Sequence, residues 1–80
     1  MNWQDHITSE AGILGGKPII KGTRLAVEHI VGYLASGWTE KDLFENLPSL
    51  TPEGLQACYA FINDCMIDGL LIHDLGRGKE

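Results

Sequence analysis

The chain has 80 residues, which is the size of one small domain. Hydrophobic residues make up 44% of it and charged residues 21%, which argues against intrinsic disorder, and no apolar run approaches the roughly 18 residues that a membrane span needs. Six Lys and Arg against eleven Asp and Glu give a formal net charge of -5, which argues against sequence-independent binding to nucleic acid.

A β-hairpin is predicted near the N-terminus. The segment over residues 15–27 reads GGKPIIKGTRLAV, with three glycines, one proline, three cations and no acid. Glycine permits the positive φ of turns, proline fixes φ, and adjacent β-branched residues favour a strand. We expect a short strand over residues 18–20 that pairs with one over Ile7–Glu10, so that an irregular hairpin spans about residues 7–22.

Three helices are predicted to follow, over about residues 26–36, 39–47 and 52–68. The first is indicated by apolar residues at positions i, i+3, i+4, i+7 and i+8, beginning at Val27. Gly37 suits the position just past the end of that helix. Short links join the three helices.

Capping residues set the bounds of the second and third helices. Thr39 can cap the second, with Asp42 three residues later in a weak capping box, and Pro48 ends it. Thr51 can cap the third, and Pro52 suits its first position. An apolar stripe then carries this helix onward: Leu55, Cys58, Tyr59, Ile62, Cys65 and Met66.

An apolar triplet, Leu70–Ile72, follows the third helix and precedes a C-terminal tail over residues 76–80. An exposed triplet of this kind favours association, so we expect it to be covered by the hairpin or by a second subunit. Together with the apolar residues of the long helix, it predicts a symmetric homodimer. The whole chain, residues 1–80, is expected to form one mainly α (α+β) domain.

No combination of residues predicts catalysis or a bound cofactor. The glycine-rich stretch matches neither a Walker loop nor Gly-x-Gly-x-x-Gly. The three histidines are far apart, so no metal site is expected, and no serine has a His or Cys partner in a recognisable nucleophile arrangement. Asp64 and Asp68 are interpreted as part of a solvated acidic face. We therefore expect a non-enzymatic protein.

The N-terminus and the cysteines indicate the compartment. Residues 1–6 lack the cationic start and apolar core of a signal peptide, so a cytoplasmic location is expected, with no membrane association. Cys58 and Cys65 are about 10.5 Å apart along the axis of the predicted helix, too far to form a disulfide with each other. They are expected to be small buried hydrophobes in a reducing environment.

The helices over residues 39–47 and 52–68 have the spacing of a helix-turn-helix, although any three-helix bundle shares it. A more specific pattern is Gly-Gly-x-Pro-x-Ile-x-Gly-Thr-Arg over residues 15–24, followed by Leu-Pro-x-Leu-Thr over residues 47–51. Further residues continue this pattern: Val27, Ile30, Leu34, Gly37, Thr39, Leu43 and Leu55. Over about residues 4–66 the chain resembles the family named domain of unknown function 433.

The resemblance implies a homeodomain-like or winged-helix-like three-helix bundle with an N-terminal β-hairpin. Members of the family are often regarded as antitoxins of type II toxin-antitoxin pairs, whose partner is a PIN-like ribonuclease. The family offers no established catalytic residues.

Charge distinguishes the possible partners. The helix over residues 52–68 could read adenine through Gln56 and Asn63, but it contains no Lys or Arg for phosphates. The expected partner- or anion-binding residues are cations elsewhere: Lys17, Lys21, Arg24 and Arg77. Arg24 or Arg77 would pair bidentately with carboxylates that otherwise hold a nuclease's catalytic Mg²⁺. We expect an antitoxin that neutralises a PIN-like nuclease and also binds its own operator; the alternatives are a stand-alone helix-turn-helix DNA-binding regulator and a structural oligomerisation module.

Overall fold

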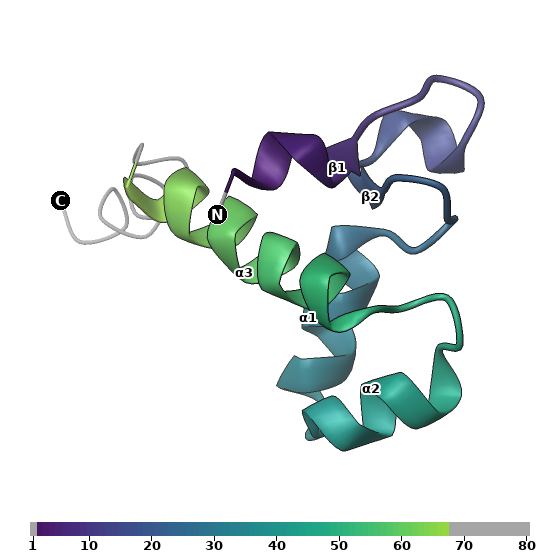
Figure 1. Ribbon diagram of the computed structural model, residues 1–80, viewed down its shortest axis with the longest axis vertical. Coiled ribbons are helices and arrows are strands. Elements are labelled where there is room, and N and C mark those ends of the chain that lie inside the picture. Colours follow the sequence, from purple (N-terminus) through teal and green to yellow (C-terminus); the bar gives the residue numbers. More distant parts are fainter. Residues whose placement is uncertain (1, 68–80) are drawn as a thin grey trace, which may run out of the picture.

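The computed structural model describes residues 2–67 of the chain, which contain seven secondary-structure elements (Figure 1). In chain order they are η1 (Trp3–Asp5), β1 (Ile7–Thr8), η2 (Leu14–Gly16), β2 (Ile19–Ile20), α1 (Val27–Ala35), α2 (Glu40–Asn46) and α3 (Pro52–Ile67), where η marks a 3₁₀ turn. Three α-helices and a two-stranded antiparallel hairpin thus form a small α+β domain. The triplet Leu70–Ile72, Arg77 and the tail over residues 76–80 lie outside the described residues.

Both strands of the hairpin are shorter than the sequence predicts, because β1 ends two residues early and β2 begins one residue late. β1 and β2 pair antiparallel, with Ile7 opposite Ile20. The predicted first strand, Ile7–Glu10, ends early because the Glu10 carbonyl accepts a hydrogen bond from the Ile13 N–H at 2.9 Å. That bond closes a turn, so the chain leaves the ladder after two residues.

Strand β2 is bonded on both of its edges, which the sequence did not indicate. Ile19 forms an antiparallel bridge with Ala26, and the Ile20 N–H donates to the Leu25 carbonyl at 3.0 Å. Ile19 and Ala26 both have 0% of their surface exposed. The backbone is therefore held on both sides of the turn over residues 21–24, and this second hairpin leads directly into α1.

The helix ends follow the predicted capping chemistry. Thr39 Oγ1 accepts from the Asp42 N–H at 3.1 Å, and the Asp42 carboxylate accepts from the Thr39 N–H at 2.8 Å, so a complete capping box starts α2. Thr51 Oγ1 accepts from the Gly54 N–H at 2.9 Å at the start of α3. Gly37 has φ +105° just beyond α1, a conformation that favours glycine.

The hydrophobic core lies where the hairpin and the helices meet, and its buried members are Ile7, Ile20, Val27, Ile30, Leu43, Leu50, Leu55, Ala57 and Cys58. Trp3 packs edge-on against Phe61, with ring centroids 4.8 Å apart, and its indole N–H donates to Asp64, so η1 is attached to α3. The predicted apolar stripes are not buried throughout, because Val31 and Met66 are 37% and 42% exposed. A domain of this size has too few elements to cover both edges of each stripe.

Candidate functional site

The predicted partner-binding cations differ in their surroundings. Lys17 Nζ lies 3.1 Å from both carboxylate oxygens of Glu28, in the first turn of α1. Its charge is thus already paired within the domain. Lys21 and Arg24 are exposed, and neither forms an ion pair with another residue in the range 2–67.

The Gly-Thr-Arg stretch builds the turn that carries Arg24. Gly22 adopts φ +78°, and the Thr23 N–H donates to the Ile20 carbonyl at 3.0 Å, which closes a four-residue turn. The Thr23 hydroxyl also donates to Ile20 at 2.8 Å and accepts from the Leu25 N–H at 3.0 Å. Thr23 therefore fixes the turn through its side chain, whereas the side chain of Arg24 is exposed and forms no ion pair within residues 2–67.

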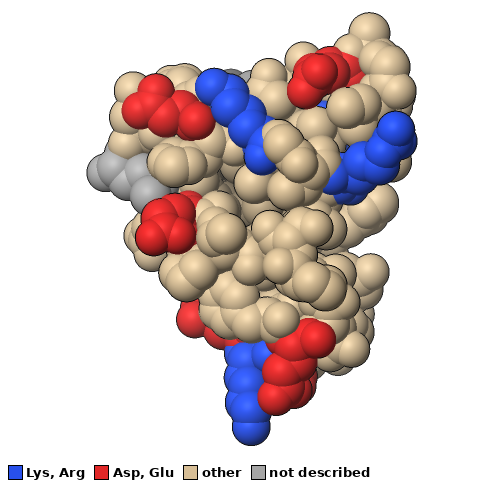
Figure 2. Space-filling view, turned by 45° about the vertical axis from the view of Figure 1, so that its right-hand side comes forward, with Lys and Arg blue, Asp and Glu red and all other residues tan. Residues whose placement is uncertain are grey.

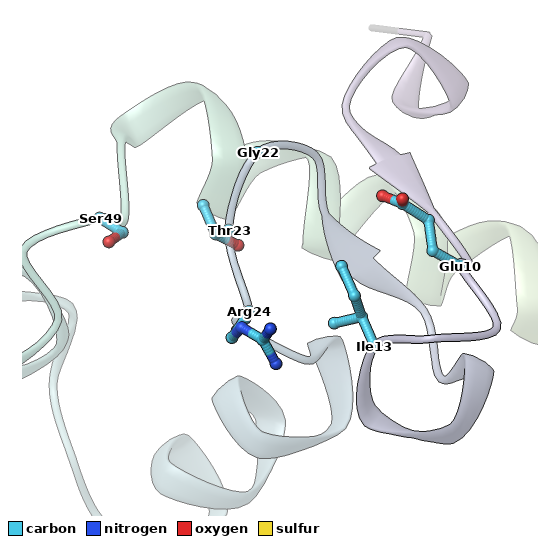
Figure 3. A pocket seen from close by; sticks show the side chains of 6 residues that line it. All are labelled: Glu10, Ile13, Gly22, Thr23, Arg24 and Ser49. Atoms are coloured by element: carbon cyan, nitrogen blue, oxygen red, sulfur yellow. The ribbon is translucent and has the colours of Figure 1, made fainter.

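Arg24 lines a pocket of about 470 Å³ between this turn and two other loops (Figure 3). The lining residues are Glu10, Ile13, Gly22, Thr23, Arg24 and Ser49. In the view of Figure 3, Ile13 lies between Arg24 and Glu10, and Ser49 lies on the opposite side of the turn. The pocket thus combines a guanidinium, a carboxylate, a hydroxyl and an apolar side chain.

Sequence reasoning missed Glu10, Ile13 and Ser49 as members of this site. The sequence predicts a strand at Glu10 and a link between helices at Ser49, and neither position carries a motif that would indicate a pocket. Ser49 is 39 positions from Glu10, so only the fold brings the two loops to one pocket.

The two predicted DNA-reading residues do not lie beside the cations on one element. Gln56 and Asn63 are both exposed on α3, together with the carboxylate residue Glu53. The carboxylate of Asp64 on the same helix accepts the hydrogen bond from Trp3. Figure 2 shows Lys and Arg side chains dispersed among carboxylates on one face, rather than gathered in a basic patch.

A second, mainly apolar groove of about 410 Å³ lies between α1 and α3. It is lined by Pro18, Val27, Glu28, Val31, Phe61, Ile62 and Cys65. Cys65 is only half-buried there, whereas Cys58 belongs to the core as predicted. The groove exposes the outer edge of the α1 stripe.

Two groups with a displaced pKa lie in the helical part of the domain. Burial raises the pKa of the Cys58 thiol to about 11. The Tyr59 hydroxyl donates to a Glu40 carboxylate oxygen at 2.7 Å, and this hydrogen bond, aided by partial burial and the Glu40 charge, raises the pKa of Tyr59 to about 12. Both groups are held in their protonated, neutral forms, which suits roles in packing and in linking α2 to α3.

Neither a metal cluster nor a membrane helix is found in the described range. Over residues 2–67, no three His, Cys, Asp or Glu side chains gather where they could bind a metal ion. None of the helices in that range combines the length and hydrophobicity that crossing a membrane requires.

The fold is that of a small α+β domain, with a pocket beside the turn that carries Arg24. Its family follows from sequence comparison: residues 7–62 match the family described as "Protein of unknown function (DUF433)", and the chain belongs to that family. This confirms the family resemblance that the Gly-Gly-x-Pro-x-Ile-x-Gly-Thr-Arg pattern indicated.

The chain is also similar to two individual proteins. The "Uncharacterized protein y4eO" of Sinorhizobium fredii (strain NBRC 101917 / NGR234) is 36% identical over 75 residues, which cover 91% of this chain and 34% of that protein. The chain therefore spans about a third of the length of this curated relative. A crystal structure of a DUF433 member protein from Anabaena variabilis ATCC 29413 superposes with a TM-score of 0.71 at 34% identity, covering 76% of this chain and 60% of the other.

Proposed function

We propose that the chain is a non-enzymatic protein of the antitoxin type, which neutralises a PIN-like nuclease in the cytoplasm by direct binding. The observation that carries the proposal is the exposed guanidinium of Arg24. It lines a pocket, and it forms no ion pair with another residue in the range 2–67. A nuclease that uses Mg²⁺ gathers carboxylates at its metal site, and a guanidinium can bind such a carboxylate through two parallel hydrogen bonds. Arg24 would then occupy the position of the metal.

The turn supports this role because it limits what binding must order. The backbone around Arg24 is fixed by the Thr23 hydrogen bonds and by the bridge between Ile19 and Ala26. A partner therefore has to immobilise the arginine side chain but not the loop that carries it. Lys17 differs from Arg24 in that it forms an exposed ion pair with Glu28.

Co-expression with a PIN-like nuclease tests the proposal, and a nuclease encoded next to the gene for this protein would be the first choice. Arg24→Ala should abolish protection from the nuclease, and calorimetry with purified nuclease should show affinity reduced roughly 30-fold or more, the effect of losing one partner of a buried ion pair. Arg24→Lys should recover only part of the wild-type affinity, because an ammonium cannot form the bidentate contact. Lys17→Ala is the matched control, since that charge already pairs with Glu28 in the domain.

Equal protection by the wild type and Arg24→Ala would refute the Arg24 mechanism while leaving the antitoxin role open. Failure of the wild type to bind or inhibit the nuclease would refute the antitoxin role itself. Arg77, the other arginine predicted to contact the nuclease, lies outside the described residues.

Operator binding is a second candidate function, and the exposure of Gln56 and Asn63 on α3 favours it. The order α2, link, α3 is compatible with a homeodomain-like helix-turn-helix. However, α3 carries Glu53 and Asp64 and no Lys or Arg, so its phosphate contacts would have to come from elsewhere. Titrating the protein with its own promoter at several salt concentrations should show a steep negative dependence of affinity on salt if phosphates are bound; no binding at low salt would exclude the function.

Self-association is a further candidate, favoured by the apolar groove between α1 and α3 and by the exposed side chains of Val31 and Met66. A structural oligomerisation module would use this surface to form a homodimer. Light scattering should then give twice the monomer mass, and a monomer mass at high micromolar concentration would contradict it.

A further inference from the structure

The pocket at Arg24 contains two opposite charges that do not neutralise each other. Arg24 and Glu10 both line it, yet no ion pair joins them or links either to another residue in the range 2–67. In Figure 3 the apolar side chain of Ile13 lies between them. The pocket lining therefore includes a cationic, an apolar and an anionic side chain.

Glu10 determines which anions suit the pocket. A polyanion such as a nucleic-acid backbone would gain from Arg24 but would be repelled by the Glu10 carboxylate. A ligand that carries a cation next to its carboxylate would gain at both ends. The pocket thus favours groups of mixed charge over groups that are only negative.

We propose that this pocket binds a mixed-charge segment of a partner protein, in which a carboxylate contacts Arg24, a neighbouring Lys or Arg contacts Glu10, and the aliphatic parts of the two side chains cross Ile13. This inference rests on the proposed function in that the pocket is a protein-binding site. It adds that the partner's carboxylate is accompanied by a cation. The Thr23 hydroxyl cannot donate to the ligand's carboxylate while the turn is intact, because its one O–H donates to the Ile20 carbonyl.

Titrations followed by the amide resonances of the ¹⁵N-labelled protein test the chemistry without any nuclease. The probes are the Glu-Lys dipeptide and the Glu-Glu dipeptide, each acetylated and amidated so that only the side chains are charged, and inorganic phosphate. We expect Glu-Lys to shift the amides of Gly22, Arg24 and Ser49 saturably, and to bind about two- to fivefold more tightly than Glu-Glu, the range measured for exposed ion pairs.

Variants identify the groups responsible. Glu10→Gln should remove the preference for Glu-Lys over Glu-Glu, and Arg24→Gln should weaken the binding of both dipeptides. Glu53→Gln is the matched control, because Glu53 is an exposed glutamate on α3 that does not line the pocket. Both altered pocket residues are exposed, and a circular dichroism spectrum like that of the wild type shows that each variant is folded.

Three results would overturn the inference: no saturable shift at the pocket, binding of Glu-Glu or phosphate as tight as that of Glu-Lys, or an unchanged preference in Glu10→Gln. These outcomes are separable from those of the nuclease experiment. If Glu10→Gln still protects fully against the nuclease while Arg24→Ala does not protect, the partner does not present a cation to Glu10. That result would contradict the mixed-charge partner and leave the antitoxin proposal intact. Selective dipeptide binding without nuclease inhibition would support the pocket and contradict the antitoxin proposal.

Discussion

Replacing Gly32 with alanine should stabilise the domain, because glycine is unfavourable within α1 and nothing opposes the added methyl group. Gly32 lies in the interior of Val27–Ala35, and a Cβ built on it meets no other atom within 4 Å. Glycine in a helix interior costs about 0.5–1 kcal/mol relative to alanine. For a domain of this size, that gain corresponds to a rise in melting temperature of about 2–8 °C.

The same substitution should have the opposite effect at two other glycines, and these serve as internal comparisons. At Gly54, in α3, a Cβ would lie 3.2 Å from Thr51 Oγ1 and 3.3 Å from Ile20 Cδ1. Thr51 caps the helix and Ile20 belongs to the core, so neither moves easily, and overpacking of about 1–3 kcal/mol exceeds the gain in helix propensity. At Gly37, φ +105° is strained for alanine, and we expect a loss of about 1 kcal/mol or more.

Thermal and urea unfolding, followed by circular dichroism, measure all three variants on one scale. The expected order of stability is Gly32→Ala above the wild type, with Gly54→Ala and Gly37→Ala below it. A lower melting temperature for Gly32→Ala would refute the reasoning, because it would mean that a contact at this position exists that the monomer does not show. Stabilisation by Gly37→Ala would show that the backbone there does not need a positive φ.

Two further predictions concern protonation. The hydrogen bond to Glu40 raises the pKa of Tyr59 from 10.0 to about 12, so the tyrosine absorbance change that is present in the wild type and absent in Tyr59→Phe should have its midpoint near pH 12. The stability from this bond is complete below pH 10 and is lost as the pH rises towards 12. A midpoint near pH 10 would contradict the hydrogen bond. Burial raises the pKa of the Cys58 thiol to about 11, whereas Cys65 is only half-buried, so a thiol reagent at mildly alkaline pH should label Cys65 first. The variants Cys58→Ser and Cys65→Ser show which cysteine gives the fast phase of labelling and which gives the slow phase. Equal labelling rates would contradict the burial of Cys58.

Local chemistry explains why much of the fold could be predicted. The capping box of Thr39 and Asp42 and the glycine after α1 act within a few residues, so their signals are present in the sequence itself. The hairpin was predicted from the same kind of signal, namely glycine, proline and β-branched residues. Its early end after Thr8 was not, because it depends on a turn that competes with the ladder for the Glu10 carbonyl.

The candidate site was predictable only in the part that one turn encodes. Gly22 and Arg24 stand in a continuous motif, and the structure gives each a separate task in the turn and the pocket. Lys17 pairs with Glu28, which is 11 positions away. The sequence does not show which of the chain's carboxylates lies next to Lys17, so this pair could not be predicted. Glu10 and Ser49 come from loops without periodicity, so their place in the pocket depends on tertiary packing.

The position of the pocket also connects recognition to the stability of the core. The turn that carries Arg24 is closed by residues whose neighbours, Ile19 and Ala26, are completely buried and bridged to each other. The ends of the turn are therefore anchored next to a buried pair, whereas the exposed side chain of Arg24 can change conformation by rotation about its own bonds. If the proposed partner binds this pocket, the anchored turn favours adaptation through side-chain rotamers, and changes in Arg24 and Glu10 should alter binding without altering the fold.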